Sequence, residues 1–364
     1  MSGLRDRLNR LSQSSGRTGS TADNKQTATI PVALHDLTSS WATINAEVYR
    51  EDSGTFVKRS VRYPLNYQVG RYELAQVQRA AAMLTCISNP QEEVAAERLL
   101  FLDTETTGLG IGAGNVPFMI GYGFIDHHSF TVEQLFMRNP AEEYFALLYL
   151  RRRLQSFSHL ATYNGRSFDW PVLKNRFVLH RLEEPTELAQ IDFLYPSRSL
   201  WRKILPTCTL SVVEKKLGIM RGNDLPGAEA PAAYIQFLDS SSVADIEPVF
   251  LHNERDIVAL AALAIAISER LRGDACNQES VPEEIIQQAL WLERLGRRKT
   301  AKLVLDRLMA SGAWLSVRQM LDAAALYKRW RQYEAAAKLW RRCVDRRNDS
   351  AMQSLEPLIE LAIY

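Results

Sequence analysis

The fold is decided by one stretch of the sequence, Leu99-Leu100-Phe101-Leu102-Asp103-Thr104-Glu105-Thr106-Thr107. Its four leading apolar residues predict a buried strand that delivers the polar residues after it to solvent. Side chains alternate along a strand, so Asp103 and Glu105 point to the same face and converge. Two converging carboxylates repel each other unless a cation lies between them, and Mg2+ and Mn2+ are the cations that prefer oxygen ligands. An Asp-x-Glu triplet alone is more often a solvated pair, so a metal site requires further carboxylates from elsewhere in the chain.

Length and composition indicate two folded domains behind a polar tail. The chain has 364 residues and is 46% hydrophobic, which is enough for a substantial core. Residues 1–29 are rich in Ser, Thr, Gly and Asn, and we expect them to form a disordered N-terminal tail. The formal net charge is only +2, but residues 291–347 carry fifteen Lys or Arg against five Asp or Glu. This local excess would suit contact with nucleic acid in the C-terminal part, and the alternative is a solvated charged face.

The cysteines and the hydropathy pattern bear on the compartment. The four cysteines lie far apart and show no zinc-binding spacing, which favours a reducing, cytoplasmic location. No apolar run approaches the roughly 18 residues of a membrane span, and the first thirty residues are polar. We therefore expect neither a signal peptide nor a membrane partner.

The order of the expected elements indicates the fold class. Residues 43–49 and 55–58 alternate around Asp52-Ser53-Gly54, which predicts a β-hairpin attached to the main domain. Residues 71–87 have the apolar spacing of a helix. After the Asp103 strand the sequence predicts strands at 118–125 and 129–137, a helix at 140–157 and a strand at 159–163. Three strands, a helix and a fourth strand are the order of an RNase H-type mixed sheet flanked by helices, an α/β fold.

A glycine-rich segment, residues 108–115, follows the Asp103 strand. It lacks the Gly-Lys-Ser/Thr of a phosphate-binding P-loop. We interpret it as a flexible loop beside the carboxylates, where small residues let a polymer backbone approach closely. A plain long turn is the alternative.

Two further motifs carry carboxylates. A strand runs into the turn Asn164-Gly165, and Asp169 lies at the head of the next helix. Asp is a common N-cap, which is the structural alternative for Asp169. Asp256 lies in a long helix from about residue 244 to 271, apolar on nearly all sides from 257 to 267. A carboxylate at the edge of so apolar a helix is costly unless it is paired or bound to a metal. His252 lies one turn earlier on the same face.

In this order the three motifs resemble the DEDD (DnaQ-like) 3′–5′ exonuclease superfamily. They read Asp103-Thr104-Glu105-Thr106, Tyr163-Asn164-x-x-x-Phe168-Asp169-x-Pro171 and His252-x-x-x-Asp256. More closely, segments at 63–65, 108–115, 200–208 and 225–229 resemble the bacterial YprB-type RNase H-fold proteins, which also carry C-terminal tetratricopeptide repeats. The resemblance covers almost the whole chain from about Leu37.

The resemblance implies an RNase H-like exonuclease domain over residues 30–275 that acts on single-stranded DNA or RNA. It implies that two Mg2+ or Mn2+ ions are held by four carboxylates, those of Asp103, Glu105, Asp169 and Asp256.

The residue that would act as general base departs from the family pattern. Superfamily members place a His five residues before the last Asp, or a Tyr four before it. Here Leu251 and His252 occupy these positions. An imidazole accepts a proton near neutral pH, so His252 is the general-base candidate. The alternative is a helix-surface histidine without a chemical role.

A smaller set of residues near the motifs is expected to contact substrate. Asn164 either positions the Asp169 turn or contacts the nucleotide sugar, and Arg166 would meet a phosphate. Both are equally explicable as turn residues. The full expected set is Thr106, Asn164, Arg166 and Phe168, with Asp192 as a supporting acid.

The C-terminal part is expected to form helical repeats over residues 283–364. The segment from Trp291 to Ala301 and the segment from Ala325 to Ala335 superpose at a spacing of 34, the tetratricopeptide period, and a third unit begins at Leu355. Such helix pairs bind peptides in a concave groove, so a protein partner is expected there. Two functions remain open: a 3′–5′ exonuclease, and a non-catalytic nucleic-acid-binding adaptor that recruits partners through the repeats.

Overall fold

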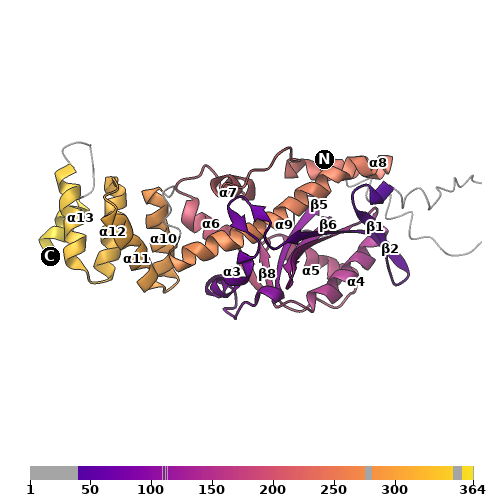
Figure 1. Ribbon diagram of the computed structural model, residues 1–364, viewed down its shortest axis with the longest axis horizontal. Coiled ribbons are helices and arrows are strands. Elements are labelled where there is room, and N and C mark those ends of the chain that lie inside the picture. Colours follow the sequence, from indigo (N-terminus) through magenta and orange to yellow (C-terminus); the bar gives the residue numbers. More distant parts are fainter. Residues whose placement is uncertain are drawn as a thin grey trace, which may run out of the picture. The chain divides into compact units, whose positions relative to one another are not determined.

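The computed structural model describes residues 40–108, 110, 112, 114–274, 281–346 and 355–363 (Figure 1). The expected tail, residues 1–29, lies outside this set, as do Leu109, Ile111 and Ala113 of the glycine-rich loop. The chain forms two compact units. The first comprises residues 1–193 and 214–265, and the second comprises 194–213 and 266–364. Residues 194–213 and the end of the long helix therefore group with the C-terminal helices.

The first unit is built on a seven-stranded mixed sheet, as the order of elements predicts. Its strand order is β1-β2-β7-β6-β5-β8-β9. Neighbouring strands pair antiparallel from β1 through β2, β7 and β6 to β5. Strand β5 pairs in parallel with β8, and β8 pairs in parallel with β9. The strands are β1 (Ala46–Glu51), β2 (Gly54–Pro64), β5 (Leu99–Thr106), β6 (Pro117–Ile125), β7 (Ser129–Phe136), β8 (His159–Thr162) and β9 (Ala189–Asp192).

The N-terminal hairpin is part of this sheet rather than an attachment to it. Asp52, at φ 49°, forms the turn between β1 and β2. Strand β2 then pairs with β7 from Val57 opposite Phe136 to Pro64 opposite Ser129. The hairpin therefore widens the sheet by two strands.

Helices cover both faces of the sheet, with α4 and α5 on one side and α9 across the other (Figure 1). One core cluster joins Leu100, Leu102 and Ile120 to residues of α4 and α5. The helices with residues in this unit are α3 (Gln76–Leu84), α4 (Glu143–Leu154), α5 (Asp169–Leu179), α7 (Leu210–Lys216), α8 (Ala230–Ser240) and α9 (Val243–Arg272). The residues of α7 and α9 are divided between the two units. Short 3-10 turns are η1 (Thr85–Ile87), η2 (Ala96–Arg98), η3 (Pro140–Glu142) and η4 (Gly227–Glu229).

A second core cluster lies between the sheet and the helices α8 and α9. It joins Trp41 and Phe136 to Tyr234 and Phe250. The predicted long helix is confirmed, with all residues from 257 to 267 buried. Alternation along β5 puts Leu100 and Leu102 toward α4 and α5, so Asp103 and Glu105 face α9.

The helix predicted over residues 71–87 begins only at Gln76. Residues before it form a two-stranded sheet of β3 (Gln68–Val69) and β4 (Tyr72–Glu73). Gly70, at φ 60°, makes the tight turn between the two strands, a conformation that glycine adopts without steric cost. The apolar periodicity of this stretch is therefore shared by a hairpin and a helix, and the expectation for residues 71–75 was wrong.

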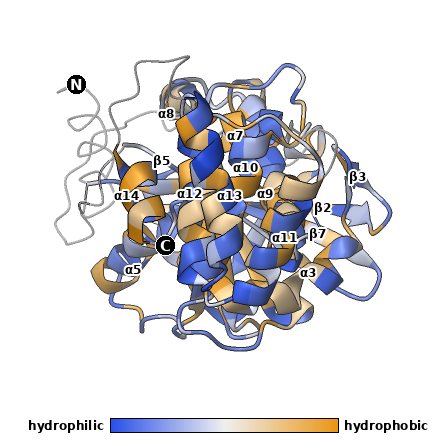
Figure 2. Ribbon diagram, turned by 90° about the vertical axis from the view of Figure 1, so that its left-hand side faces the viewer, coloured by the Kyte–Doolittle hydropathy of each residue, from blue (hydrophilic) through white to orange (hydrophobic). Residues whose placement is uncertain are grey.

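The second unit is helical, with consecutive helices packed in pairs, α10 on α11 and α12 on α13. The helices are α6 (Leu194–Trp201), α10 (Pro282–Arg294), α11 (Arg298–Ala310), α12 (Val317–Arg329), α13 (Tyr333–Asp345) and α14 (Glu356–Ile363). Figure 2 shows the apolar character of α14, whose Ile359 and Ile363 are 55% and 73% exposed. No helix among the described residues is long and apolar enough to cross a membrane.

The two helix pairs match at a spacing of 35 rather than 34. Gly296 and Arg331 both adopt positive φ, 74° and 61°, just after the first helix of their pair. The buried Ala301 corresponds to the buried Ala336 at the same spacing. Sequence identity around the loops suggests 34, but the left-handed turn and the buried positions fix the repeat at 35.

Gly121 of β6 provides a test of how α9 packs on the sheet. A Cβ at this position would lie 1.9 Å from Oδ1 of the buried Asn253. We expect Gly121→Ala to lower the free energy of unfolding by about 1–3 kcal/mol, because overpacking displaces the helix or its side chain. Urea unfolding measures the change. Gly222→Ala is the control, since a Cβ at Gly222 meets nothing within 4 Å, and equal stability of the two variants would contradict the packing argument.

Candidate active site

Asp103 and Glu105 lie within strand β5, which continues to Thr106. They are covered by α9, and Glu105 is only 8% exposed. The expectation that the strand delivers them to solvent was wrong, because the apolar helix α9 crosses this part of the strand. The register of β5 with β6 shifts between Glu105 and Thr106, an irregularity that re-aims side chains at the end of the strand.

Asp169 reaches β5 from the first residue of α5. Its Oδ1 accepts hydrogen bonds from the backbone nitrogen of Thr104 at 3.1 Å and from Thr104 Oγ1 at 2.5 Å. The N-cap position belongs to Phe168. The alternative of Asp169 as a simple N-cap is therefore not what the structure shows.

The turn that places Asp169 is held by a neighbouring strand. Asn164 adopts φ 66°, the left-handed conformation that Asn tolerates. At the end of β9, Asp192 accepts hydrogen bonds from the backbone nitrogens of Asn164 at 2.8 Å and Arg166 at 3.3 Å. Asp192 thus fixes the turn.

His252 and Asp256 lie one turn apart on α9, as their spacing predicts. His252 Nε2 is 3.5 Å from Asp256 Oδ2 and 4.0 Å from Glu105 Oε1. These three residues each offer one ligand atom, and the three atoms lie within 4.8 Å of one another. Oxygen donors with one imidazole are a donor set that divalent metal ions accept.

Burial and nearby charges raise the pKa values of Asp103, Glu105 and Asp169. Burial, and then the charges of Asp256 and Asp169, raise the pKa of Asp103 well above its usual range. The same causes raise the pKa of Glu105 to about 8. Burial raises the pKa of Asp169 to about 6 against the opposing hydrogen bonds from Thr104. The four carboxyl groups therefore form one electrostatically coupled cluster, which a divalent cation would stabilise.

Arg221 lies at the carboxylate cluster, although the sequence pattern did not single it out. Its guanidinium forms ion pairs with Asp256 and Glu214, and donates to Asp224 Oδ2 at 2.8 Å. Arg221 therefore supplies one positive charge at the edge of the cluster. The sequence signal was a charged run just before the segment 225–229, but nothing local indicates that it folds against Asp256.

Asp224, also missed, orients His252. Its Oδ2 lies 3.0 Å from His252 Nδ1, and its Oδ1 accepts from Arg255 at 2.8 Å. Burial would raise the pKa of Asp224, but the Arg221 hydrogen bond and the charge of His252 lower it overall. An ionised Asp224 accepts a hydrogen bond from Nδ1–H, so the Nε2 of a neutral His252 faces the carboxylates as an acceptor.

A chain of amides fixes Asp103 from the other side. Asn253 Nδ2 donates to Asp103 Oδ2 at 3.0 Å, and Asn253 Oδ1 accepts from Gln134 Nε2 at 3.0 Å. Gln134 Oε1 in turn accepts from Arg59 at 2.8 Å. Arg59 has only donors, so it sets the orientation of both amides. As a result, Asn253 presents an N–H to Asp103.

The residues expected to contact substrate have internal partners. Thr106 Oγ1 donates to the carbonyl of Gly108 at 2.6 Å. With the Asn89 amide oriented to face it, the Arg166 guanidinium donates to Asn89 at 2.9 and 3.2 Å. Asn164 is exposed and Phe168 half-buried. Their contact with substrate stays a prediction.

Comparison with known proteins places the chain in a family. The profile of the RNase_H superfamily matches residues 100–268, which contain all four carboxylates. "Uncharacterized protein YprB" of Bacillus subtilis (strain 168) is 31% identical over 314 residues, 84% of this chain and 75% of that protein. The chain belongs to the RNase H-like YprB family. This membership suggests a nuclease and implies binding of nucleic acid, and RNase H-like nucleases typically use divalent metals.

The raised pKa values predict an unusual pH dependence of stability. Glu105 titrates near 4.5 in an unfolded chain and about 8 when folded, so the folded protein binds more protons between these pH values. Stability in EDTA should therefore fall as the pH rises from 5 to 8, by about 1.4 kcal/mol per pH unit for each titrating group. Thermal unfolding measures it. Asp103→Asn should be more stable than the wild type at pH 8 in EDTA, whereas Glu247→Gln, on the exposed side of α9, should not. A wild type more stable at pH 8 than at pH 5 in EDTA would contradict the repulsion.

Proposed function

We propose that the protein is a metal-dependent nuclease that hydrolyses phosphodiester bonds of single-stranded DNA or RNA from the 3′ end. The observation that carries the proposal is a cluster of four carboxyl groups on β5, α5 and α9, in which the pKa values of Asp103, Glu105 and Asp169 are raised. A structural role does not require like charges to be buried together, because such a cluster costs stability. The similarity of the three acidic motifs to DEDD exonucleases supports the 3′ end as the point of attack.

The donor set fits a site for Mg2+ or Mn2+. Asp103, Glu105, Asp169 and Asp256 would hold two ions, with oxygen ligands that hard divalent cations prefer. Ions held there would supply Lewis acidity, which lowers the pKa of a bound water and offsets the charge on a leaving oxygen. The chain itself keeps the ligands in place: Thr104 holds Asp169, and Asn253 holds Asp103.

His252 is the proposed general base. Asp224 holds its Nδ1, so the Nε2 lone pair faces Glu105 and Asp256. The imidazole there accepts a proton from water at the cluster. Gly227 allows this placement, since a Cβ at Gly227 would lie 3.1 Å from His252 Nε2.

The main test compares variants on labelled single-stranded DNA and RNA with Mn2+. We expect the wild type to shorten a 5′-labelled strand from its 3′ end. Asp103→Asn and Asp256→Asn should each lower the rate about 100-fold or more, because each removes a ligand charge. Glu247→Gln should match the wild type. Activity that survives both substitutions would overturn the proposal, and binding without hydrolysis by the wild type would favour the adaptor.

His252 has its own test. His252→Ala should lower kcat by roughly 100- to 10,000-fold and flatten the acidic limb of the pH profile, while Mn2+ affinity by calorimetry stays unchanged. Asp224→Asn should shift that limb to lower pH, because the imidazole loses the carboxylate that favours its charged form. A parallel loss of Mn2+ affinity in His252→Ala would show instead that the imidazole is a metal ligand.

A further inference from the structure

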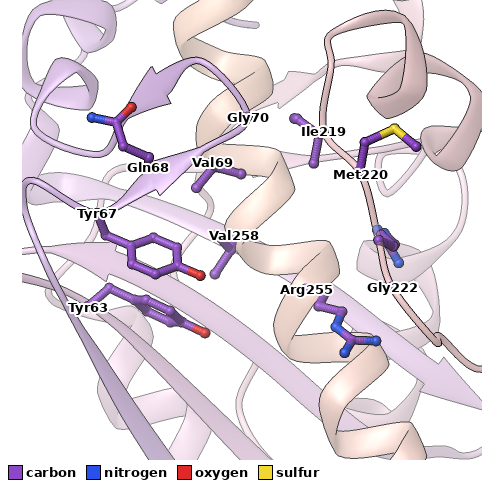
Figure 3. A pocket seen from close by; sticks show the side chains of 11 residues that line it. Tyr63, Tyr67, Gln68, Val69, Gly70, Ile219, Met220, Gly222, Arg255 and Val258 are labelled. Carbon is purple, nitrogen blue, oxygen red and sulfur yellow. The ribbon is translucent and has the colours of Figure 1, made fainter.

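A pocket of about 200 Å³ adjoins the acid cluster in the first unit (Figure 3). Segments far apart in the sequence form it: the end of β2, the β3–β4 turn, the loop after α7, and α9. Its lining residues are Tyr63, Tyr67, Gln68, Val69, Gly70, Ile219, Met220, Arg221, Gly222, Arg255 and Val258.

One wall of the pocket is aromatic and the opposite wall is aliphatic. The rings of Tyr63 and Tyr67 lie with their centroids 4.7 Å apart and tilted by 58°. Figure 3 shows Ile219 and Met220 across from them. Tyr67 is 43% exposed and Met220 is 78% exposed. Two large apolar side chains thus stand open to solvent on opposite sides of a cavity, an arrangement typical of a ligand site.

The pocket also has positive charge, which it shares with the acid cluster. Arg221 lines the pocket and pairs with Asp256. Arg255 lines it as well, with its NH1 held by Asp224 and by the carbonyl of Asn223 at 2.8 Å. An anionic group that enters beside the aromatic wall therefore meets two guanidinium groups, each of which also pairs with a carboxylate of the first unit.

The aromatic wall is held in place. The Tyr63 hydroxyl donates to Glu254, whose other oxygen is 2.5 Å from Arg59 NH1. Arg59 is buried and also donates to the carbonyl of Ile44 at 2.8 Å. The fixed Tyr63 ring supports the exposed Tyr67 ring, whose centroid lies 4.7 Å away. A ring supported in this way offers a stacking surface with a smaller loss of side-chain entropy on binding.

We propose that this pocket binds the base of the 3′-terminal nucleotide of a single-stranded nucleic acid, with Tyr67 as the stacking residue and Arg255 near its phosphate. This inference rests on the proposed nuclease function and names the subsite for its substrate. Stacking on an aromatic ring together with arginine is how proteins hold single strands without reading their sequence. The volume lies below the roughly 300–1,000 Å³ of pockets for drug-sized ligands, which suits one base.

The test measures binding without catalysis. A short single-stranded oligonucleotide with 2-aminopurine at its 3′ end is titrated with protein in EDTA, and a second one carries the probe at its centre. We expect the 3′ probe to be quenched on binding and the central probe to be quenched less. Tyr67→Ala should weaken binding by roughly 5- to 150-fold, the effect of losing one base stack. Tyr67→Phe should bind like the wild type, because the ring remains.

Tyr195→Ala controls for loss of an exposed tyrosine elsewhere, since Tyr195 is 49% exposed on α6. Unquenched 3′ probe, equal quenching at both positions, or equal affinity of Tyr67→Ala and the wild type would overturn the subsite. Hydrolysis with Mn2+ is measured separately on the same variants. If Tyr67→Ala cleaves and binds like the wild type while Asp103→Asn is inactive, the subsite is wrong and the nuclease stands. If the wild type quenches the probe but never cleaves, the nuclease proposal fails and the base pocket remains.

Discussion

The structure depends on keeping like charges together inside a protein. Asp103, Glu105, Asp169 and Asp256 come from three separate elements. Burial raises the pKa values of Asp103, Glu105 and Asp169, and repulsion within the cluster adds to this for Asp103 and Glu105. Burial of carboxylates costs free energy that only packing and paired charges elsewhere can offset. The apolar length of α9, buried from residue 257 to 267, supplies much of that packing. The cluster is thus held in place by a helix whose apolar residues 257 to 265 are buried within the first unit.

Polar contacts around the cluster divide into two kinds. On one side Arg221 brings positive charge, which offsets repulsion directly. On the other side Asn253, Gln134 and Arg59 bring no charge to Asp103 but a fixed N–H donor. The first kind of contact offsets the repulsion between the carboxylates in the absence of metal. The second kind keeps the Asp103 carboxylate oriented toward the other three. Gly121 is required for the second kind, because only a residue without a side chain lets Asn253 reach the strand.

The parts of the fold that could be predicted are those with a repeating pattern. The alternation in β5 and the apolar run in α9 place Asp103, Glu105 and Asp256 correctly, because these periods are set by backbone geometry. Arg221 and Asp224 belong to no such pattern. Their partners Asp256 and His252 lie about thirty residues further along the chain, and the path of the loop after α7 brings them together. The β3–β4 hairpin was missed for a related reason, since Gly70 interrupts a stretch whose apolar spacing also suits a helix.

Asn253 could have been singled out from the sequence, because it is a polar residue in a helix that is apolar further along. Its meaning depended on its neighbours, however. Five consecutive residues of α9 all contact the site. His252 and Arg255 contact Asp224, Asn253 contacts Asp103, Glu254 contacts Arg59, and Asp256 contacts Arg221. Successive residues of a helix are rotated by about 100°, so five of them face all directions. This turn of α9 must therefore be surrounded, by the sheet on one side and by the loop after α7 on the other. Arg59 donates to both Glu254 and Gln134, and Gln134 donates to Asn253. One hydrogen-bonded chain therefore joins the aromatic wall of the pocket to Asp103. A base on that wall and a metal ion at Asp103 would thus act on the same rigid element.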